Sequence, residues 1–218
     1  MIYMLDTANV QEVARLLELY PIDGVTTNPS IIAKAGRPLK ETIADLRRCI
    51  GEDLMLHVQP ISETAEAMVE DSLRYYDLVK GNYYAKIPVT PQGIKAIQIL
   101  KSKGIKVTAT AIFTQQQALI AAKAGADFIA PYVNRLDNIS SDGIGVVADI
   151  MQFINVYNFD TKVLAASFKN VEQVHRVSLL GGHSVTIAPD LFESLLYHPL
   201  TESAITDFKR DGLPYYQE

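Results

Sequence analysis

The chain has 218 residues, of which 48% are hydrophobic and 21% charged, and its net charge is −5. These values predict one globular domain over 1–218 with a large core, and the negative charge argues against non-specific nucleic-acid binding. A single cysteine excludes an intramolecular disulfide. Asp6 interrupts the apolar start, and no apolar run reaches the roughly 18 residues of a membrane span. We therefore expect no signal peptide, no membrane partner and a cytoplasmic location.

Eight short apolar runs, rich in Val, Ile and Tyr, alternate with longer amphipathic segments along the chain. The runs predict strands at 2–6, 24–28, 54–59, 83–89, 106–113, 127–133, 162–167 and 184–188. Helical spacing of apolar residues predicts helices at 10–20, 38–50, 62–79, 91–103, 114–124, 142–158, 171–180 and 190–197. One more short helix is expected in the tail 200–218, which either packs on a neighbouring subunit or frays.

Strands that alternate with helices are typical of βαβ units and a parallel sheet. Eight such units are the number that closes a (β/α)₈ barrel, the TIM barrel, and we predict this α/β fold as a single domain. The alternative is a doubly wound open sheet. No GxGxxG motif follows the first predicted strand, which weakens a dinucleotide-binding version of that alternative.

Lys86 lies in the middle of the predicted strand 83–89, between apolar neighbours. A side chain in such a strand faces either the lumen or the helices, and neither side offers easy access to solvent. Desolvation favours the neutral amine of a lysine, and a neutral amine attacks carbonyls to give an imine, an electron sink for breaking C–C bonds. We therefore predict a Schiff base at Lys86. The alternative is a structural lysine that reaches the barrel mouth or pairs with a carboxylate.

Polar residues end the first three predicted strands. Asp6 either caps the next helix or faces the barrel mouth as a catalytic carboxylate, since Thr7 or Asn9 can supply the cap instead. Asn28 precedes a proline, and either forms a strand-to-helix turn or binds a ligand. Gln59 is expected to bind a ligand through its amide rather than to fill the core.

The later strands carry further polar candidates. Thr110 lies in the fifth predicted strand, where threonine is common and packing alone explains it as well as binding does. Tyr132 lies in the sixth predicted strand, where a tyrosine usually packs. Arg135 follows that strand and is well placed to fork a phosphate. Ser167 ends the seventh predicted strand, and barrels often bind phosphate after strands seven and eight.

The histidines form neither an HxH nor an HExxH pattern, and the cysteine is single. We therefore predict no metal site. The lysines are dispersed rather than gathered in a basic stripe, so we expect no nucleic-acid partner.

Six segments carry a combined signature: LDTAN (5–9), GVTTNPSII (24–32), KIPVT (86–90), GIKVTATAIF (104–113), APYVNRLD (130–137) and KVLAASFKN (162–170). Through them the chain resembles the transaldolase family, and most closely its short members, the fructose-6-phosphate aldolases. The segments span nearly the whole chain. The resemblance implies a (β/α)₈ barrel with the Schiff-base lysine on the fourth strand, where the independent strand count also puts Lys86.

The resemblance also implies roles at the reacting carbon atoms. Lys86 would form the imine with a ketose donor. Asp6 would orient the amine and exchange a proton with the substrate hydroxyl next to the bond that is cleaved. Asn28 would bind hydroxyls of the donor, and Thr110 would position a catalytic water.

Two positions separate the aldolases from the transaldolases of this family. Transaldolases carry glutamate where this chain has Gln59, and phenylalanine where it has Tyr132. A phenol that shares a water with Gln59 and Thr110 can protonate the enamine, which releases free dihydroxyacetone. Without a proton donor the enamine waits for another aldehyde, and the reaction becomes a transfer. Both positions therefore favour the aldolase.

We predict a class I aldolase that reversibly cleaves fructose 6-phosphate to dihydroxyacetone and glyceraldehyde 3-phosphate, with Arg135 and Ser167 holding the phosphate of the aldehyde. No cofactor is expected, because the imine supplies the electron sink. One alternative is a transaldolase that moves a dihydroxyacetone unit between sugar phosphates such as sedoheptulose 7-phosphate and glyceraldehyde 3-phosphate. A remote alternative is a non-catalytic sugar-phosphate-binding protein. The resemblance further implies a ring-based homo-oligomer, a pentamer or decamer, to which the tail 200–218 can contribute.

Overall fold

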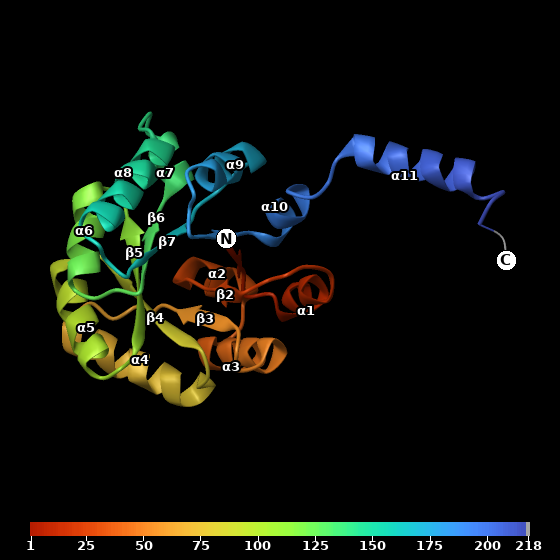
Figure 1. The fold of residues 1–218 in the computed structure, drawn as a ribbon. Helices are drawn as coiled ribbons and strands as arrows, with labels where there is room; N and C mark the ends of the chain where they lie inside the picture. Colours follow the sequence, from red (N-terminus) through yellow and green to blue (C-terminus); the bar gives the residue numbers. More distant parts are fainter. Residues whose placement is uncertain (217–218) are drawn as a thin grey trace.

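Eight parallel strands close into a barrel in the computed structural model, which describes residues 1–216 (Figure 1). Each strand pairs with the next one along the chain, and β8 pairs with β1. The strands are β1 (Ile2–Asp6), β2 (Gly24–Thr26), β3 (Met55–Val58), β4 (Tyr83–Pro88), β5 (Lys106–Ile112), β6 (Phe128–Pro131), β7 (Lys162–Ala165) and β8 (Ser184–Ile187). The predicted (β/α)₈ barrel is confirmed, and the open-sheet alternative is wrong.

Helices α1 to α10 lie around the outer side of the barrel, and α11 extends away from it (Figure 1). They are α1 (Val10–Leu19), α2 (Pro29–Ala35), α3 (Leu39–Ile50), α4 (Ala65–Val79), α5 (Pro91–Ser102), α6 (Gln115–Lys123), α7 (Val133–Asp137), α8 (Gly143–Val156), α9 (Val171–Leu179), α10 (Pro189–Ser194) and α11 (Pro199–Gly212). Within residues 1–216, none of these helices is long and apolar enough to cross a membrane.

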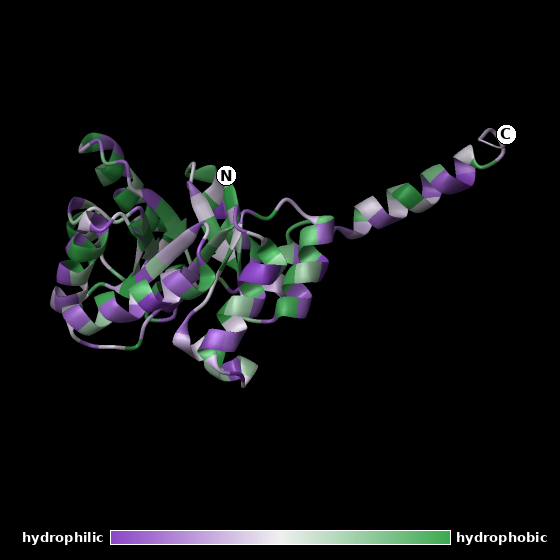
Figure 2. Ribbon diagram, turned by 90° about the horizontal axis from the view of Figure 1, so that it is seen from below, coloured by the Kyte–Doolittle hydropathy of each residue, from purple (hydrophilic) through white to green (hydrophobic). Residues whose placement is uncertain are grey.

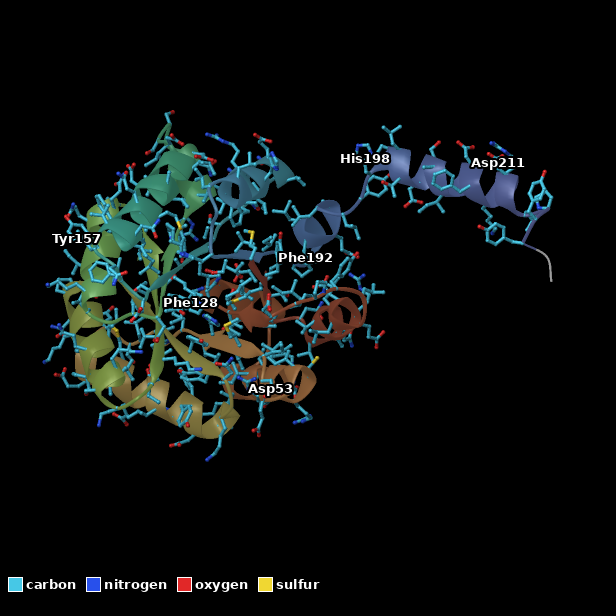
Figure 3. All side chains as sticks on the ribbon, in the orientation of Figure 1. Asp53, Phe128, Tyr157, Phe192, His198 and Asp211 are labelled. Atoms are coloured by element: carbon cyan, nitrogen blue, oxygen red, sulfur yellow. The ribbon has the colours of Figure 1, made fainter. Side chains whose placement is uncertain are left out.

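The barrel has two separate apolar regions, because successive side chains of a strand point to opposite faces. The larger core lies between the strands and the surrounding helices. A smaller cluster fills the lumen and contains Met4, Tyr84, Phe128 and Leu164. Figure 3 shows Phe128 inside the ring of strands. Since Lys86 is two residues beyond Tyr84 on β4, its side chain also faces the lumen.

Two short helices were not predicted, and each begins within three residues of the end of a strand. α2 occupies residues for which we expected only a turn after Asn28. α7 begins at Val133, so the sixth strand is shorter than predicted and Tyr132 is the N-cap residue of a helix. The seventh strand ends at Ala165, so Ser167 lies two residues past it and has a left-handed backbone (φ +62°).

The C-terminal helix α11 stands apart from the barrel, as Figures 1 and 2 show from two directions. It has 14 residues, begins one residue earlier than expected, and contains no buried side chain. Exposed apolar residues of α11 include Leu200, Ile205 and Phe208. In Figure 3, His198 and Asp211 mark this helix, well away from the strands.

Candidate active site

The candidate residues gather at the carboxyl ends of the strands, which is where (β/α)₈ barrels build their active sites. Asp6 is the last residue of β1, and Lys86 and Thr110 lie two residues before the ends of β4 and β5. Gln59 and Tyr132 each follow directly on the last residue of a strand. The (β/α)₈ topology therefore brings these residues, which are far apart in the sequence, to one end of the barrel.

Lys86 is enclosed in the lumen with only 3% of its surface exposed. Its Nζ donates a hydrogen bond to the backbone oxygen of Thr27 at 3.1 Å. Within residues 1–216, no carboxylate lies within 4.0 Å of the Lys86 amine. The side chain is thus desolvated, as predicted, and both structural alternatives, a lysine at the barrel mouth or one paired with an acid, are wrong.

Asp6 is free of the helix cap that was one of its two predicted uses. Oδ1 of Asn9 accepts hydrogen bonds from the first turn of α1 and is the cap. The Asp6 carboxylate instead accepts a 2.7 Å hydrogen bond from the hydroxyl of Thr26, its register partner on β2. A groove of about 700 Å³ opens beside Asp6, lined by residues of α1, α2 and the β8–α10 connection. Asp6 is therefore a half-buried carboxylate at the barrel mouth.

Asn28 is the N-cap residue of α2. Its Oδ1 accepts a hydrogen bond from the backbone N–H of Ile31 at 3.0 Å. The expectation of a strand-to-helix turn is confirmed in this respect. Because the cap uses the amide oxygen, the Nδ2 group is the part of the side chain that is left to donate to a ligand.

Thr110 and Tyr132 are brought together by an irregularity in β5. Ala111 has a left-handed backbone (φ +59°), and the register between β5 and β6 shifts between Ala109 and Ile112. The hydroxyl of Thr110 is buried and lies 3.1 Å from the phenol oxygen of Tyr132. The Tyr132 ring also packs edge-on against Phe113. This hydrogen bond is the direct link between two residues that were predicted to share a catalytic water.

Gln59 is half-buried and lies just past the end of β3. It lines a groove of about 640 Å³ together with Pro29, Pro60 and Thr90, among others. No hydrogen bond joins its amide to Thr110 or Tyr132 in the part of the chain that is described. The structure therefore brings Gln59 to the same end of the barrel without bringing it into contact with the predicted pair.

Arg135 and Ser167 come from neighbouring segments that are held together by backbone hydrogen bonds. The amide of Val133 donates to the oxygen of Ala166, and the amide of Asn134 donates to the oxygen of Ser167 at 2.7 Å. The exposed guanidinium of Arg135 lies over the ring of Tyr132, 4.8 Å from its centroid. The first turn of α7 is thus tied to the end of β7, which brings the two predicted phosphate ligands to adjacent segments.

A group of polar residues deeper in the lumen was not predicted from the sequence. Thr26, His57, Thr108 and Thr186 are all buried there. Thr26 shares a 2.6 Å hydrogen bond with Thr186, and Nδ1 of His57 lies 2.8 Å from the hydroxyl of Thr108. The signal that could have found His57 is the alternation in LMLHVQ, which puts it on the same strand face as Gln59.

His57 is fully buried and remains an uncharged imidazole near neutral pH. Burial, and next the positive charge of Lys86, hold the pKa of His57 well below its ordinary value. Over residues 1–216, no three His, Cys, Asp or Glu side chains are grouped so as to hold a metal ion.

This arrangement is suited to carbonyl chemistry on a covalent amine. It combines a desolvated amine at Lys86, a carboxylate at Asp6 and a phenol at Tyr132, all at one end of the barrel. An amine supplies a nucleophile, a carboxylate a general base, and a phenol a proton donor or acceptor.

Comparison with known proteins gives a consistent result. Residues 3–214 match the family described as Transaldolase/Fructose-6-phosphate aldolase. A probable fructose-6-phosphate aldolase of Streptococcus pneumoniae is 41% identical over 210 residues, covering 96% of this chain and 95% of the relative. A probable transaldolase of Symbiobacterium thermophilum is 39% identical over 207 residues, covering 95% and 94% of the two chains. A probable transaldolase of a Thermoanaerobacter species is 39% identical over 209 residues, with 96% and 95% covered. The protein is therefore an enzyme of the transaldolase/fructose-6-phosphate aldolase family.

Proposed function

We propose that the protein is a Schiff-base aldolase that reversibly cleaves fructose 6-phosphate to dihydroxyacetone and glyceraldehyde 3-phosphate. The observation that carries this proposal is the amine of Lys86, enclosed in the lumen of a barrel of this family with 3% of its surface exposed. Within residues 1–216, no carboxylate lies within 4.0 Å of this amine, so the group is not held in an ion pair. No cofactor or metal is needed for this chemistry, because the iminium itself accepts electrons.

In the first half of the reaction, Nζ of Lys86 adds to the C2 carbonyl of the ketose to give a carbinolamine, which takes up a proton from solvent and loses water to form the iminium. Asp6 then takes the proton of the C4 hydroxyl while the C3–C4 bond breaks. The electron pair of that bond moves into the iminium and forms an enamine, and glyceraldehyde 3-phosphate departs. The position of Asp6 at the end of β1, free of the helix cap, supports this role. Asn28 would hold donor hydroxyls through its Nδ2 group.

In the second half, the enamine must gain a proton at C3 before water hydrolyses the imine and releases dihydroxyacetone. We assign this proton to Tyr132, through a water held with Thr110 and Gln59. The 3.1 Å contact between the Thr110 hydroxyl and the Tyr132 phenol supports the assignment, because it orients the phenol at the barrel mouth. Gln59 makes no direct hydrogen bond to Thr110 or Tyr132 within residues 1–216, so its amide would contact them through this water.

The phosphate of the aldehyde would bind to Arg135 and Ser167. A guanidinium forks phosphate oxygens with two parallel hydrogen bonds, and a serine hydroxyl adds a third donor. The backbone bonds that tie α7 to the end of β7 support this pairing.

A transaldolase is the second candidate, and the names of two relatives favour it, since both are probable transaldolases. The two activities differ in the fate of the enamine. An assay for free dihydroxyacetone from fructose 6-phosphate, with and without erythrose 4-phosphate, separates them. We expect release without the acceptor; release that depends on the acceptor would identify a transaldolase instead.

We also propose a homo-oligomer, a pentamer or decamer, in which α11 packs on a neighbouring copy. The helix leaves the barrel with its apolar side chains exposed, among them Phe208 at 73%. The mass in solution tests this proposal, since a chain whose α11 has no partner would have the 24.1 kDa of one protomer. The single free thiol, Cys49, fits a reducing compartment, so we propose a cytoplasmic location, which cell fractionation would check.

A further inference from the structure

Gln173, on the first turn of α9, makes hydrogen bonds in two directions and has no part in the proposed reaction. It is buried, with 8% of its surface exposed. Its Oε1 accepts a 2.8 Å hydrogen bond from the backbone N–H of Lys169, the residue before the N-cap Asn170. Its Nε2 donates to Oδ2 of Asp137 at 2.6 Å and to Oδ1 of Asn134 at 3.3 Å. The side chain therefore joins α9 to α7.

Helix capping explains the oxygen side of Gln173 but not the nitrogen side. A glutamine or glutamate at the third position of a helix commonly accepts hydrogen bonds from the backbone around the N-cap residue. Gln117 does the same on α6, where its Oε1 accepts from the N–H groups of Phe113 and Thr114. Within residues 1–216, Nε2 of Gln117 donates no hydrogen bond to another helix. Since glutamate would cap α9 equally well, the donor that Gln173 turns toward α7 needs another reason.

The short helix α7 is attached at both of its ends. It has five residues and no side-chain N-cap, so contacts with neighbouring segments must hold it in place. Backbone hydrogen bonds tie its first turn to the segment that follows β7. At its last residue, the Asp137 carboxylate accepts from Gln173 and, at 3.0 Å, from the N–H of Gly143. Arg135 lies between these two attachments. The second attachment limits rotation about the first, and therefore sets the direction in which the Arg135 side chain leaves the helix.

Gln173 also acts on the segment that carries Ser167. The N–H that its Oε1 accepts belongs to Lys169, two residues after that serine. Ser167 has a left-handed backbone (φ +62°), a conformation that a serine keeps only where surrounding contacts hold it. Gln173 thus contacts both segments that carry the proposed phosphate ligands.

We propose that Gln173 and Asp137 are positioning residues for the phosphate of the aldehyde: their hydrogen bond holds Arg135 where it can share a phosphate group with Ser167. This inference rests on the proposed phosphate site. A hydrogen bond to a carboxylate is stronger than one between neutral groups, so the pair is suited to fixing α7. A displacement of about 1 Å is enough to weaken a two-point contact of a guanidinium. The pair therefore contributes to a preference for a phosphorylated aldehyde over the same aldehyde without phosphate.

The test exchanges the two groups of this hydrogen bond in the full-length protein. Gln173→Glu keeps an oxygen to accept from Lys169 but puts a carboxylate against Asp137. Asp137→Asn puts an amide N–H group against either the Gln173 amide or the Gly143 N–H. The double variant D137N/Q173E restores one amide and one carboxylate, with the asparagine now donating to the glutamate. The measured quantity is the selectivity for phosphate, which is kcat/KM for glyceraldehyde 3-phosphate divided by kcat/KM for glyceraldehyde, with dihydroxyacetone as the donor.

We expect each single variant to lower this selectivity about tenfold, as for the loss of a hydrogen bond to a charged group. The double variant should recover to within about threefold of the native value, because the pair is coupled. The value of kcat/KM for glyceraldehyde should stay near native throughout. An effect of charge alone would have opposite signs, since Q173E adds a negative charge and D137N removes one. Gln117→Glu adds the same charge at the matching position of α6, and should keep the native selectivity.

Four results would overturn the proposal. Native selectivity in both single variants would show that Gln173 only caps α9. A loss in Q173E with a gain in D137N would show an effect of charge. A double variant no better than Q173E would show that the hydrogen bond is irrelevant, and equal losses for both aldehydes would show general damage to the barrel.

A second variant and a reference keep the test decisive. If a single variant does not fold, Asn134→Ala takes its place; it removes the longer hydrogen bond of Gln173, so we expect a loss of about threefold, and native selectivity would overturn the proposal. Arg135→Lys is measured alongside. Native selectivity in R135K would refute the phosphate site itself, whereas a loss in R135K without one in the Gln173 and Asp137 variants would refute only the present inference.

Discussion

The phenol oxygen of Tyr132 lies 3.1 Å from the hydroxyl oxygen of Thr110, across the boundary between β5 and β6. The left-handed residue Ala111 directly after Thr110 accompanies the register shift at this point. The guanidinium of Arg135 lies over the same tyrosine ring. Tyr132 thus contacts both Thr110, which we propose holds the catalytic water, and Arg135, which we propose binds the phosphate.

Tyr132→Phe removes the phenol without changing the ring that packs on Phe113. We expect the release of free dihydroxyacetone from fructose 6-phosphate to fall roughly 100-fold, which is typical for loss of a general acid–base group. Transfer to erythrose 4-phosphate should be retained, because the enamine can still attack an aldehyde. Thr110→Val is the matched variant and should shift the ratio of release to transfer in the same direction. A ratio unchanged in both variants would refute the assignment.

The burial of His57 makes stability depend on pH. Its pKa in the folded protein is held well below the value of about 6.5 in an unfolded chain. Below pH 6.5 the unfolded state binds a proton that the folded state refuses. The free energy of unfolding should therefore fall as the pH drops from 6.5 to 5, by up to about 1.4 kcal/mol per pH unit, and should show no such loss above 6.5.

Urea unfolding at a series of pH values measures this slope. His57→Phe is the control and should remove most of it, leaving a smaller part from His183, whose pKa is also lowered by burial. A native protein with the same stability at pH 5 and pH 6.5 would contradict the burial of a neutral His57.

Arg135→Lys keeps the positive charge but removes the fork that binds a phosphate with two hydrogen bonds. We expect the KM for glyceraldehyde 3-phosphate in the synthetic direction to rise about tenfold, while kcat changes little, because the phosphate is remote from the bond that forms. Arg176→Lys, on an exposed site of α9, is the control. An unchanged KM in R135K would show that the phosphate binds at another site.

The alternation of strands and helices in the barrel could be predicted from the sequence. Short apolar runs indicate buried strands, whereas apolar residues at helical spacing indicate amphipathic helices. The short helices α2 and α7 could not be predicted, since α2 has no buried residue and α7 has only five residues. Before α2, Asn28 indicated only a turn, and the first residue of α7, Val133, was predicted to end a strand. The bulge at Ala111 also left no local signal, although it accompanies the contact between Thr110 and Tyr132.

Among the site residues, Lys86 was the most predictable, because a charge inside an apolar strand has few explanations. The surroundings of His57 were not, since its contacts with Tyr84 and Thr108 come from strands that are distant in sequence. Gln59 shows the opposite case: the resemblance implied that it shares a catalytic water with Thr110 and Tyr132, and within the described residues no direct hydrogen bond joins its amide to either of them.

Substitution of apolar side chains on α11 should lower the mass of the oligomer and leave the fold of the barrel unchanged. Ile205→Asp with Phe208→Asp places two charges on a helix that buries no side chain in its own protomer. We expect the mass from light scattering to fall to that of smaller assemblies, while the far-UV spectrum is unchanged. Lys209→Asp on the same helix is the control for charge alone. A native mass in the double variant would exclude α11 from the interface.

The most direct test of the central claim is to find which residue carries the substrate. The native protein is incubated with dihydroxyacetone and borohydride, digested, and examined by mass spectrometry, with Lys86→Met as the control. We predict one reduced adduct, on Lys86, and none in K86M. No adduct in the native protein, or an adduct on another lysine that persists in K86M, would contradict the account.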